Sequence, residues 1–425
     1  GAELWKTDGT ETGTVRVKDI QSGTLGSSPR YLTNVEGTLF FAARDAGVFS
    51  NYVLWKSDGT EAGTVKVKDL RATHLTNVGG TVFFRANGGV TGYELWKTDG
   101  TEVGTILVKD IRPGAFQPSD PSNLTDVGGT LFFEANDGVS GRELWKSDGT
   151  LEGTVMVSDI FTGASGSFPS RLTNFGGELF FTASDGEGTG LWKSDGTAAG
   201  TVRVHVLNSR VAGNLTNVGG TLFFQDGREL WKSDGTEAGT VLVKDIRSSD
   251  FQSSYPANLT GVGGTLFFQA DDGTNGRELW KSDGTLEGTV LVSDIFTGSS
   301  DSNPTQLTNV GEKLFFAAND GVNGNELWTS DGTESGTIRV TDIFPGASSA
   351  SLGSMTNVNG TLFFSADDGV SGIELWKSDG TAANTILVKN IRAGTYSSTP
   401  GRVTDVDGML FFHANDGISG IELWK

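Results

Sequence analysis

The octapeptide Glu143-Leu144-Trp145-Lys146-Ser147-Asp148-Gly149-Thr150 recurs almost unchanged along this chain of 425 residues and decides how the rest can fold. Most copies are 47 to 50 residues apart, and two intervals are shorter, at 41 and 39 residues. Self-similarity at this period predicts a repeat architecture, because one such unit is too small to bury its own apolar surface. We therefore expect residues 1–425 to form a single domain of nine repeats of about 48 residues. Every tryptophan lies in a copy of the octapeptide: Trp5, Trp55, Trp96, Trp145, Trp192, Trp231, Trp280, Trp328, Trp376 and Trp424.

A complete repeat can be followed from residue 124 to residue 160. Alternating apolar residues predict strands, and the segments between them contain Gly, Asn and Asp, which favour tight turns. No segment has the pattern of a helix, so the repeat is expected to be four antiparallel strands in sequence order. The expected strands are residues 124–127, 130–135, 143–146 and 154–160.

The second strand of every repeat carries two adjacent phenylalanines, as in Phe132-Phe133. Neighbouring residues of a strand point to opposite faces of the sheet, so both faces must be covered by other parts of the protein. A small sheet packed between two copies of itself is a blade of a β-propeller. Nine copies of this strand predict an all-β fold, a nine-bladed β-propeller of four-stranded antiparallel blades.

The two ends of the chain bear on closure of the ring. Residues 403–414 supply a first and a second strand, and residues 15–20 supply a fourth strand. We therefore expect the last blade to be closed by both termini. The third strand is supplied twice, by residues 3–6 and by residues 422–425, so one copy is surplus. An open β-solenoid array, in which an additional strand needs no explanation, remains the alternative.

The composition limits the partners. A formal charge of −20 argues against nucleic acid as a partner and against binding to anionic membranes. The sequence has no apolar run of about 18 residues, so we expect no membrane span. Cysteine is absent, which excludes disulfides and thiol chemistry. A monomer is expected.

The repeated Glu-Leu-Trp-Lys-Ser-Asp-Gly-Thr, followed by Gly-Thr-Val and Val-Lys-Asp-Ile, resembles the ELWxxDGT repeats of bacterial surface and secreted proteins. The resemblance covers the whole chain. It implies a propeller-like fold and an extracellular or cell-surface location in a bacterium, and it carries no established catalytic residue. Two copies depart from the pattern, with Val53 and Gly190 in place of the glutamate.

The recurring polar residues are explained best by structure. Asp-Gly-Thr is typical of a turn in which the aspartate accepts backbone N–H bonds, and it lacks the ligand spacing of a calcium loop. Calcium is conceivable at the Asn-Asp-Gly turns, such as the one at Asp137, but otherwise no cofactor or metal site is expected. The glutamate before Leu-Trp, as in Glu94, is interpreted as a cross-strand partner of lysine rather than an acid catalyst. The three histidines, His74, His205 and His413, lie in different repeats without ligand-like spacing.

The linkers between repeats vary while the strands do not, so they are the better place to seek a site. Several linkers carry aromatic residues beside polar ones, an arrangement that suits stacking on a sugar ring or docking of a protein. The alternative is that each ring is a hydrophobic plug for its own linker. Two linkers are short, residues 71–74 and residues 207–214. The candidate ligand-binding residues are Phe116, Phe168, Phe251, Tyr255 and Tyr396.

These observations favour a non-enzymatic extracellular binding or scaffold module of the adhesion type, with a glycan or a surface protein as partner. A multivalent carbohydrate-binding lectin with several similar sites is the alternative. A hydrolase with a site in the central channel is a more distant one. No catalytic residue is expected, because nine equal copies of a motif do not make one distinctive active site.

Overall fold

The computed structural model describes residues 1–22, 25–45, 52–208, 213, 215–248 and 253–418. These residues form two compact units, one of residues 16–215 and one of residues 1–15 together with 216–425. The described chain is all-β, in eight antiparallel sheets, and its only helical element is the short 3-10 turn η1 (Ala382–Asn384). Nothing in it forms a helix long and apolar enough to cross a membrane.

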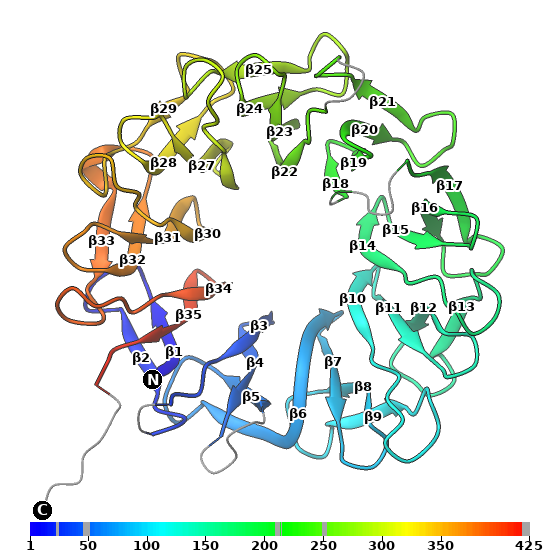
Figure 1. The fold of residues 1–425 in the computed structure, drawn as a ribbon. Helices are drawn as coiled ribbons and strands as arrows, with labels where there is room; N and C mark the ends of the chain where they lie inside the picture. Colours follow the sequence, from blue (N-terminus) through cyan, green and yellow to red (C-terminus); the bar gives the residue numbers. More distant parts are fainter. Residues whose placement is uncertain (23–24, 46–51, 209–212, 214, 249–252, 419–425) are drawn as a thin grey trace, which may run out of the picture. The chain divides into compact units, whose positions relative to one another are not determined.

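The 16–215 unit contains three sheets whose strands follow one another in sequence order (Figure 1). Its strands are β3 (Arg30–Val35), β4 (Thr38–Arg44), β5 (Tyr52–Ser57), β6 (Val65–Val78), β7 (Thr81–Asn87), β8 (Tyr93–Thr98), β9 (Ile106–Lys109), β10 (Ser122–Val127), β11 (Thr130–Asn136), β12 (Arg142–Ser147), β13 (Val155–Ser158), β14 (Ser170–Phe175), β15 (Glu178–Ser184), β16 (Thr189–Ser194) and β17 (Val202–Val206). The repeats of this unit that start at β3, in β6, at β10 and at β14 are called the first to the fourth repeat.

One sheet of this unit has seven strands, from β3 to β9, where two separate four-stranded sheets were expected. The reason is β6, which continues for 14 residues from the last strand of the first repeat into the first strand of the second repeat. The linker here, residues 71–74, is too short to leave the sheet and return. It therefore becomes part of the strand.

The unit of residues 216–425 and 1–15 contains the remaining repeats. Its strands are β1 (Ala2–Thr7), β18 (Thr216–Val218), β19 (Thr221–Asp226), β20 (Glu229–Ser233), β21 (Val241–Lys244), β22 (Ala257–Val262), β23 (Thr265–Asp271), β24 (Arg277–Ser282), β25 (Val290–Ser293), β26 (Thr305–Val310), β27 (Lys313–Asn319), β28 (Asn325–Ser330), β29 (Ile338–Arg339), β30 (Gly353–Val358), β31 (Thr361–Asp367), β32 (Ile373–Ser378), β33 (Ile386–Lys389), β34 (Gly401–Val406) and β35 (Met409–Asn415).

The two ends of the chain share one sheet, in the order β2-β1-β35-β34. Its strand β1 pairs with β35 along its whole length, from Ala2 opposite Asn415 to Thr7 opposite Leu410. Strand β2 (Val15–Lys18) begins at the boundary of the two units. The N-terminal copy of the third strand therefore takes the place beside β35. The other copy, residues 422–425, lies outside the described residues.

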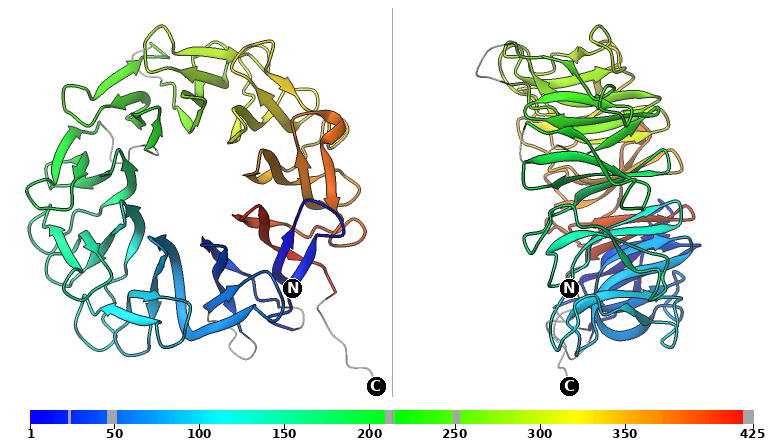
Figure 2. Two further views of the ribbon diagram at one scale, coloured as in Figure 1. Left: turned by 180° about the vertical axis from the view of Figure 1, so that it is seen from behind. Right: turned by 90° about the vertical axis from the view of Figure 1, so that its right-hand side faces the viewer.

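The paired phenylalanines are buried on both faces of their sheets, as the sequence predicted. Phe132 is 4% exposed and Phe133 is fully buried. On one face of the third repeat, Phe132 and Leu144 pack against Leu179 and Phe181 of the fourth repeat in one apolar cluster. Within each unit, successive sheets stack face to face in this way, as blades of a propeller do (Figure 2).

The Asp-Gly-Thr turns tie neighbouring repeats together. Asp148 Oδ1 accepts hydrogen bonds from the backbone N–H and the hydroxyl of Thr150, both at 2.8 Å. Gly149 has a φ of +87°, and a Cβ there would lie 3.1 Å from the Phe83 ring of the preceding repeat. Lys109, at the end of the second repeat, donates to the carbonyl of Thr154 at 2.7 Å. These turns are structural, as expected, and the lysines of the motif bind the next repeat.

Candidate functional site

A glutamate at the start of the third strand accepts hydrogen bonds from the linker that follows in the described repeats with Glu94, Glu143, Glu229, Glu278, Glu326 and Glu374. In the second repeat, Glu94 is fully buried and accepts three hydrogen bonds: from the N–H of Ile111 at 3.0 Å, from the N–H of Ser119 at 2.7 Å and from the Ser119 hydroxyl at 2.6 Å. The interpretation of this glutamate as a partner of lysine is therefore wrong. Its carboxylate satisfies donors of the linker that would otherwise be buried without acceptors.

Burial outweighs these hydrogen bonds and raises the pKa of Glu94 to about 7. The pKa of Glu278 and of Glu326 is raised to about 7 by the same cause. The two repeats that lack the glutamate, with Val53 and Gly190, are also the two that are followed by a short linker. The glutamate is thus missing only where the following linker is short, and its raised pKa follows from its burial in the scaffold.

Five positions surround the point where each linker enters the first strand, and we call them the mouth of the repeat. They are the residue after the linker serine, the first residue of the first strand, the residue after the two phenylalanines, the last residue of the second strand and the first residue of the third strand. The scaffold beneath them is constant, but the side chains differ. They are Ser28, Arg30, Ala42, Arg44 and Tyr52 in the first repeat, Asp120, Ser122, Glu134, Asn136 and Arg142 in the third, and Phe168, Ser170, Thr182, Ser184 and Thr189 in the fourth.

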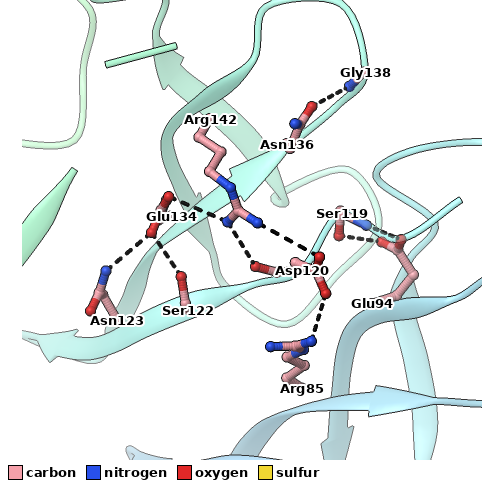
Figure 3. Close-up of polar contacts among 10 residues, drawn as sticks. All are labelled: Arg85, Glu94, Ser119, Asp120, Ser122, Asn123, Glu134, Asn136, Gly138 and Arg142. Carbon is pink, nitrogen blue, oxygen red and sulfur yellow. Dashed lines mark hydrogen bonds and ion pairs between the residues drawn. The ribbon is translucent and has the colours of Figure 1, made fainter. Parts of the chain in front are cut away.

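The mouth of the third repeat is filled by a neutralised ionic network (Figure 3). Asp120 contacts Arg85 of the second repeat at 2.6 Å and Arg142 at 3.6 Å. Arg142 also lies 3.3 Å from Glu134, which accepts a hydrogen bond from the Ser122 hydroxyl at 2.8 Å. Every charged group in this network has a partner of the opposite sign, so the third repeat has no uncompensated charge at its mouth.

The mouth of the first repeat has the opposite character. The guanidinium carbon of Arg30 lies 4.3 Å from the centre of the Tyr52 ring, and that of Arg44 lies 5.2 Å from it. No ion pair joins either arginine to an acid among the described residues. The neighbouring Asp45 is engaged by Lys66 at 2.7 Å. We call Arg30, Arg44 and Tyr52 the arginine–tyrosine clamp.

The clamp replaces a residue that stabilises the same turn in the third repeat. In the third repeat the position of Arg44 is Asn136, whose side chain accepts the Gly138 N–H at 2.7 Å and caps the turn. Arginine has no acceptor and gives up this cap. The Nε atoms of Arg30 and Arg44 and the hydroxyl of Tyr52 are also buried without a hydrogen-bond partner among the described residues. Positions that break the local rules of a fold are where function is expected.

Some of the other buried polar atoms that lack a partner among the described residues recur at equivalent positions, and these belong to the scaffold. The indole N–H is one of them, in Trp5, Trp55, Trp96, Trp145, Trp280 and Trp376. Among the described residues, Arg85 Nε and Asn325 Oδ1 are also without a partner at mouth positions of other repeats. Tyr255 likewise lies near two arginines, Arg228 at 5.4 Å and Arg277 at 5.7 Å. Sequence reasoning missed the clamp because it searched the linkers. The available signal was the combination of two arginines and a tyrosine at these positions of one repeat, where the third repeat carries Ser122, Asn136 and Arg142.

The mouth of the fourth repeat is a cavity of about 310 Å³. Its lining includes Phe168, which is 56% exposed, and the hydroxyls of Ser170, Thr182 and Thr189. The cavity exists because Thr182 and Thr189 are much smaller than Glu134 and Arg142, their counterparts in the third repeat. The mouths are therefore not several similar sites, as the lectin alternative required.

The predicted ligand-binding aromatic residues are dispersed. Phe116 and Phe168 are 73% and 56% exposed and line separate cavities of the 16–215 unit. In the other unit, Tyr255 is 39% exposed and lies 5.4 Å from Arg228, whereas Tyr396 is 65% exposed. These rings are not plugs, and their role in binding stays a prediction. Phe251 lies outside the described residues.

No group of three or more His, Cys, Asp or Glu side chains among the described residues could hold a metal ion. His74 lies 5.3 Å from the Tyr31 ring, and burial together with Arg85 lowers its pKa. A neutral His74 beside Tyr31 fits a packing role at the border between the first and second repeats.

No family model and no curated protein matches the chain. Several solved structures do match it in fold. Puromycin hydrolase is 16% identical over 80% of this chain and 58% of its own, with a TM-score of 0.38. Prolyl oligopeptidase B from Galerina marginata is 10% identical over 85% of this chain and 51% of its own, with a TM-score of 0.46. AztD from Citrobacter koseri is 11% identical over 97% of this chain and 98% of its own, with a TM-score of 0.42.

The chain spans about half the length of the two hydrolases. This comparison overturns the expectation of a non-enzymatic binding or scaffold module of the adhesion type, because several of the structures that match this chain are peptidases. The likeness concerns the arrangement of strands and assigns no activity to this chain.

Proposed function

We propose that the chain recognises an anionic group, a carboxylate, sulfate or phosphate, in the arginine–tyrosine clamp of the first repeat. One observation carries the proposal: the guanidinium groups of Arg30 and Arg44 both lie against the ring of Tyr52. Neither arginine has an acidic partner among the described residues, and the Nε atom of each is without a hydrogen-bond partner there. The chain has 52 acidic residues, and uncompensated positive charge is therefore a departure from its general character.

The geometry suits an anion with two or three oxygens. A guanidinium group that stacks on an aromatic ring contacts the ring through its own flat face. Its N–H donors point outward in the plane of the group and stay available for an anion. Each hydrogen bond from such a group to an anion contributes roughly 1.5–3 kcal/mol. The tyrosine ring holds both guanidinium groups in place before the anion arrives, so binding loses less side-chain entropy.

The surroundings leave the clamp charge uncompensated. Asp45 is held by Lys66, and residues 46–51 of the sequence, which join β4 to β5, contain no acidic residue. At the two mouth positions that carry Asp120 and Glu134 in the third repeat, the first repeat has Ser28 and Ala42. The acids that neutralise the third repeat are thus replaced by side chains without charge.

Isothermal titration with sulfate, phosphate and succinate tests the proposal, with the ionic strength kept constant by a chloride salt. The protein should bind at least one of these anions, and Arg30→Ala and Arg44→Ala should each weaken binding at least tenfold. Arg142→Ala is the matched control, because Arg142 is already paired in the third repeat. Absence of binding at millimolar anion, or an equal loss in Arg142→Ala, would contradict the proposal.

We further propose that the nine repeats are nine blades of one closed ring. Support comes from the sheet that β1 and β2 share with β34 and β35, because closure by both termini requires such a sheet. Electron microscopy should show a disc with a central hole, whereas an elongated particle would favour the open solenoid. Membership of the ELWxxDGT family, an extracellular location, a monomeric state and the lack of a cofactor stay predictions.

A further inference from the structure

A second cavity lies in the 16–215 unit, between the first and second repeats, and has a volume of about 420 Å³. This volume falls in the range of roughly 300–1,000 Å³ that is usual for small-molecule sites. Its lining comes from the end of the first repeat, from the turn after β7 and from the linker that follows the second repeat. The lining residues are Val53, Asp69, Leu70, Arg71, Asn87, Gly88, Gly89 and Phe116.

The short linker explains why this space is open. The full-length linker after the second repeat returns across the ends of the strands, and its Ser119 binds the buried Glu94. After the first repeat, β6 runs straight into the second repeat and no linker covers this place. The glutamate is replaced by Val53, which is 2% exposed, so the floor is apolar instead of charged.

The cavity combines an apolar floor with one exposed cation. Leu70 is 6% exposed beside Val53, and the Phe116 ring, 73% exposed, forms a wall. The loop of Phe116 is fixed by its N–H, which donates to the Val90 carbonyl at 2.9 Å. Arg71 is exposed and sits between Val53 and Asn87 in the strand register.

The other polar side chains of the lining offer no second cation. Asp69 is an exposed carboxylate that lies 3.7 Å from Lys66, which itself binds Asp45 at 2.7 Å, and the side-chain oxygen of Asn87 accepts the Gly89 N–H at 2.7 Å. Arg71 is the lining side chain left to receive a negatively charged group. A ligand that fits must therefore present one anion to Arg71 and an apolar body to Val53, Leu70 and Phe116.

We propose that this cavity binds a hydrophobic carboxylate, an aromatic or short aliphatic acid. The site goes beyond the anion clamp, since it selects for an apolar body that the clamp does not contact. Its specificity follows from the missing linker: the apolar part of the ligand takes the place of the linker, and Arg71 takes the carboxylate.

Calorimetry with benzoate and hexanoate, compared with the neutral benzamide and hexanamide, tests this inference. We expect the carboxylates to bind and the amides to bind at least tenfold more weakly. Arg71→Gln should remove the preference for the carboxylate, and Phe116→Ala should weaken benzoate at least fivefold. Both residues are exposed, so both variants should fold, which their circular dichroism can verify.

Two controls separate this site from the rest. Phe168→Ala removes an exposed ring from the other cavity and should leave benzoate binding unchanged. Arg30→Ala should also leave it unchanged, although it weakens sulfate at the clamp. Loss of benzoate binding in Arg30→Ala, together with retention in Arg71→Gln, would overturn the inference. So would equal affinity for the amides, or no benzoate binding by the unmodified chain.

Discussion

The first and third repeats share one backbone scaffold, yet their mouths carry opposite charge balances. The Arg44 N–H donates to the Ser27 carbonyl at 2.8 Å, and the equivalent Asn136 N–H donates to the Ser119 carbonyl at 2.9 Å. On this common frame the third repeat pairs every charge, whereas the first repeat places two arginines on a tyrosine. The difference shows that the scaffold and the mouth are separable: one fixes the fold, and the other is free to change.

Substitutions in the core shared by both repeats should lower the free energy of unfolding most. Phe132→Ala removes a ring that is 4% exposed between the third and fourth repeats, and we expect a loss of roughly 3–5 kcal/mol in the free energy of unfolding. Phe116→Ala, at an exposed ring, should change it by less than about 0.5 kcal/mol. Chemical denaturation measures both. A loss below about 1 kcal/mol for Phe132→Ala would show that this strand is not core.

A smaller effect should separate the two mouths. Glu134→Ala leaves Arg142, Ser122 and Asn123 without their shared acceptor, and we expect a loss of roughly 1–3 kcal/mol. Arg30→Ala removes a cation with no acidic partner among the described residues, so stability should stay within about 1 kcal/mol or rise. If denaturation gave equal losses for the two variants, the contrast between a neutralised and an uncompensated mouth would be wrong.

Proton binding should reveal the buried glutamates. A raised pKa in the folded state means that folding takes up protons, so their contribution is full below the unfolded pKa of about 4.5 and is lost as the pH rises through about 7. The turn aspartates, such as Asp148, have a lowered pKa and act oppositely, losing their contribution as the pH falls below about 4. We therefore expect the highest melting temperature near pH 4–5, with a decline toward pH 8.

A single substitution isolates this contribution. Glu94→Gln should remove about 3 kcal/mol of the pH-dependent decline, because the amide does not titrate. Glu102→Gln, at an exposed glutamate of an Asp-Gly-Thr turn, is the control and should leave the decline unchanged. A melting temperature that rises from pH 5 to pH 8 would contradict the assignment.

Much of the fold could be predicted from the sequence, because repetition multiplies each local signal. The double phenylalanines predicted sheets covered on both faces, and Phe133 is fully buried. The continuous strand β6 was not predicted, because a linker of four residues reads as a turn until its geometry is known. The role of Glu94 was also missed, since its partner Ser119 lies 25 residues away and sequence spacing gave no reason to join them.

The candidate site could be predicted only in part. The varying linkers pointed to one end of the strands, and Phe116 and Phe168 line cavities there. The clamp depends on Arg30, Arg44 and Tyr52, which come from three different strands. Only the pairing of Arg30 with Ala42 and of Arg44 with Tyr52 brings them together.

The most direct measurement is a sulfate titration of the Ala42→Glu variant. Ala42 occupies the position of Glu134, and a carboxylate there would neutralise the clamp as it neutralises the third repeat. We predict that this variant loses sulfate affinity at least tenfold while its unfolding curve is retained. An Ala42→Glu variant that folds and binds sulfate as tightly as the unmodified chain would contradict the claim that the clamp is the site.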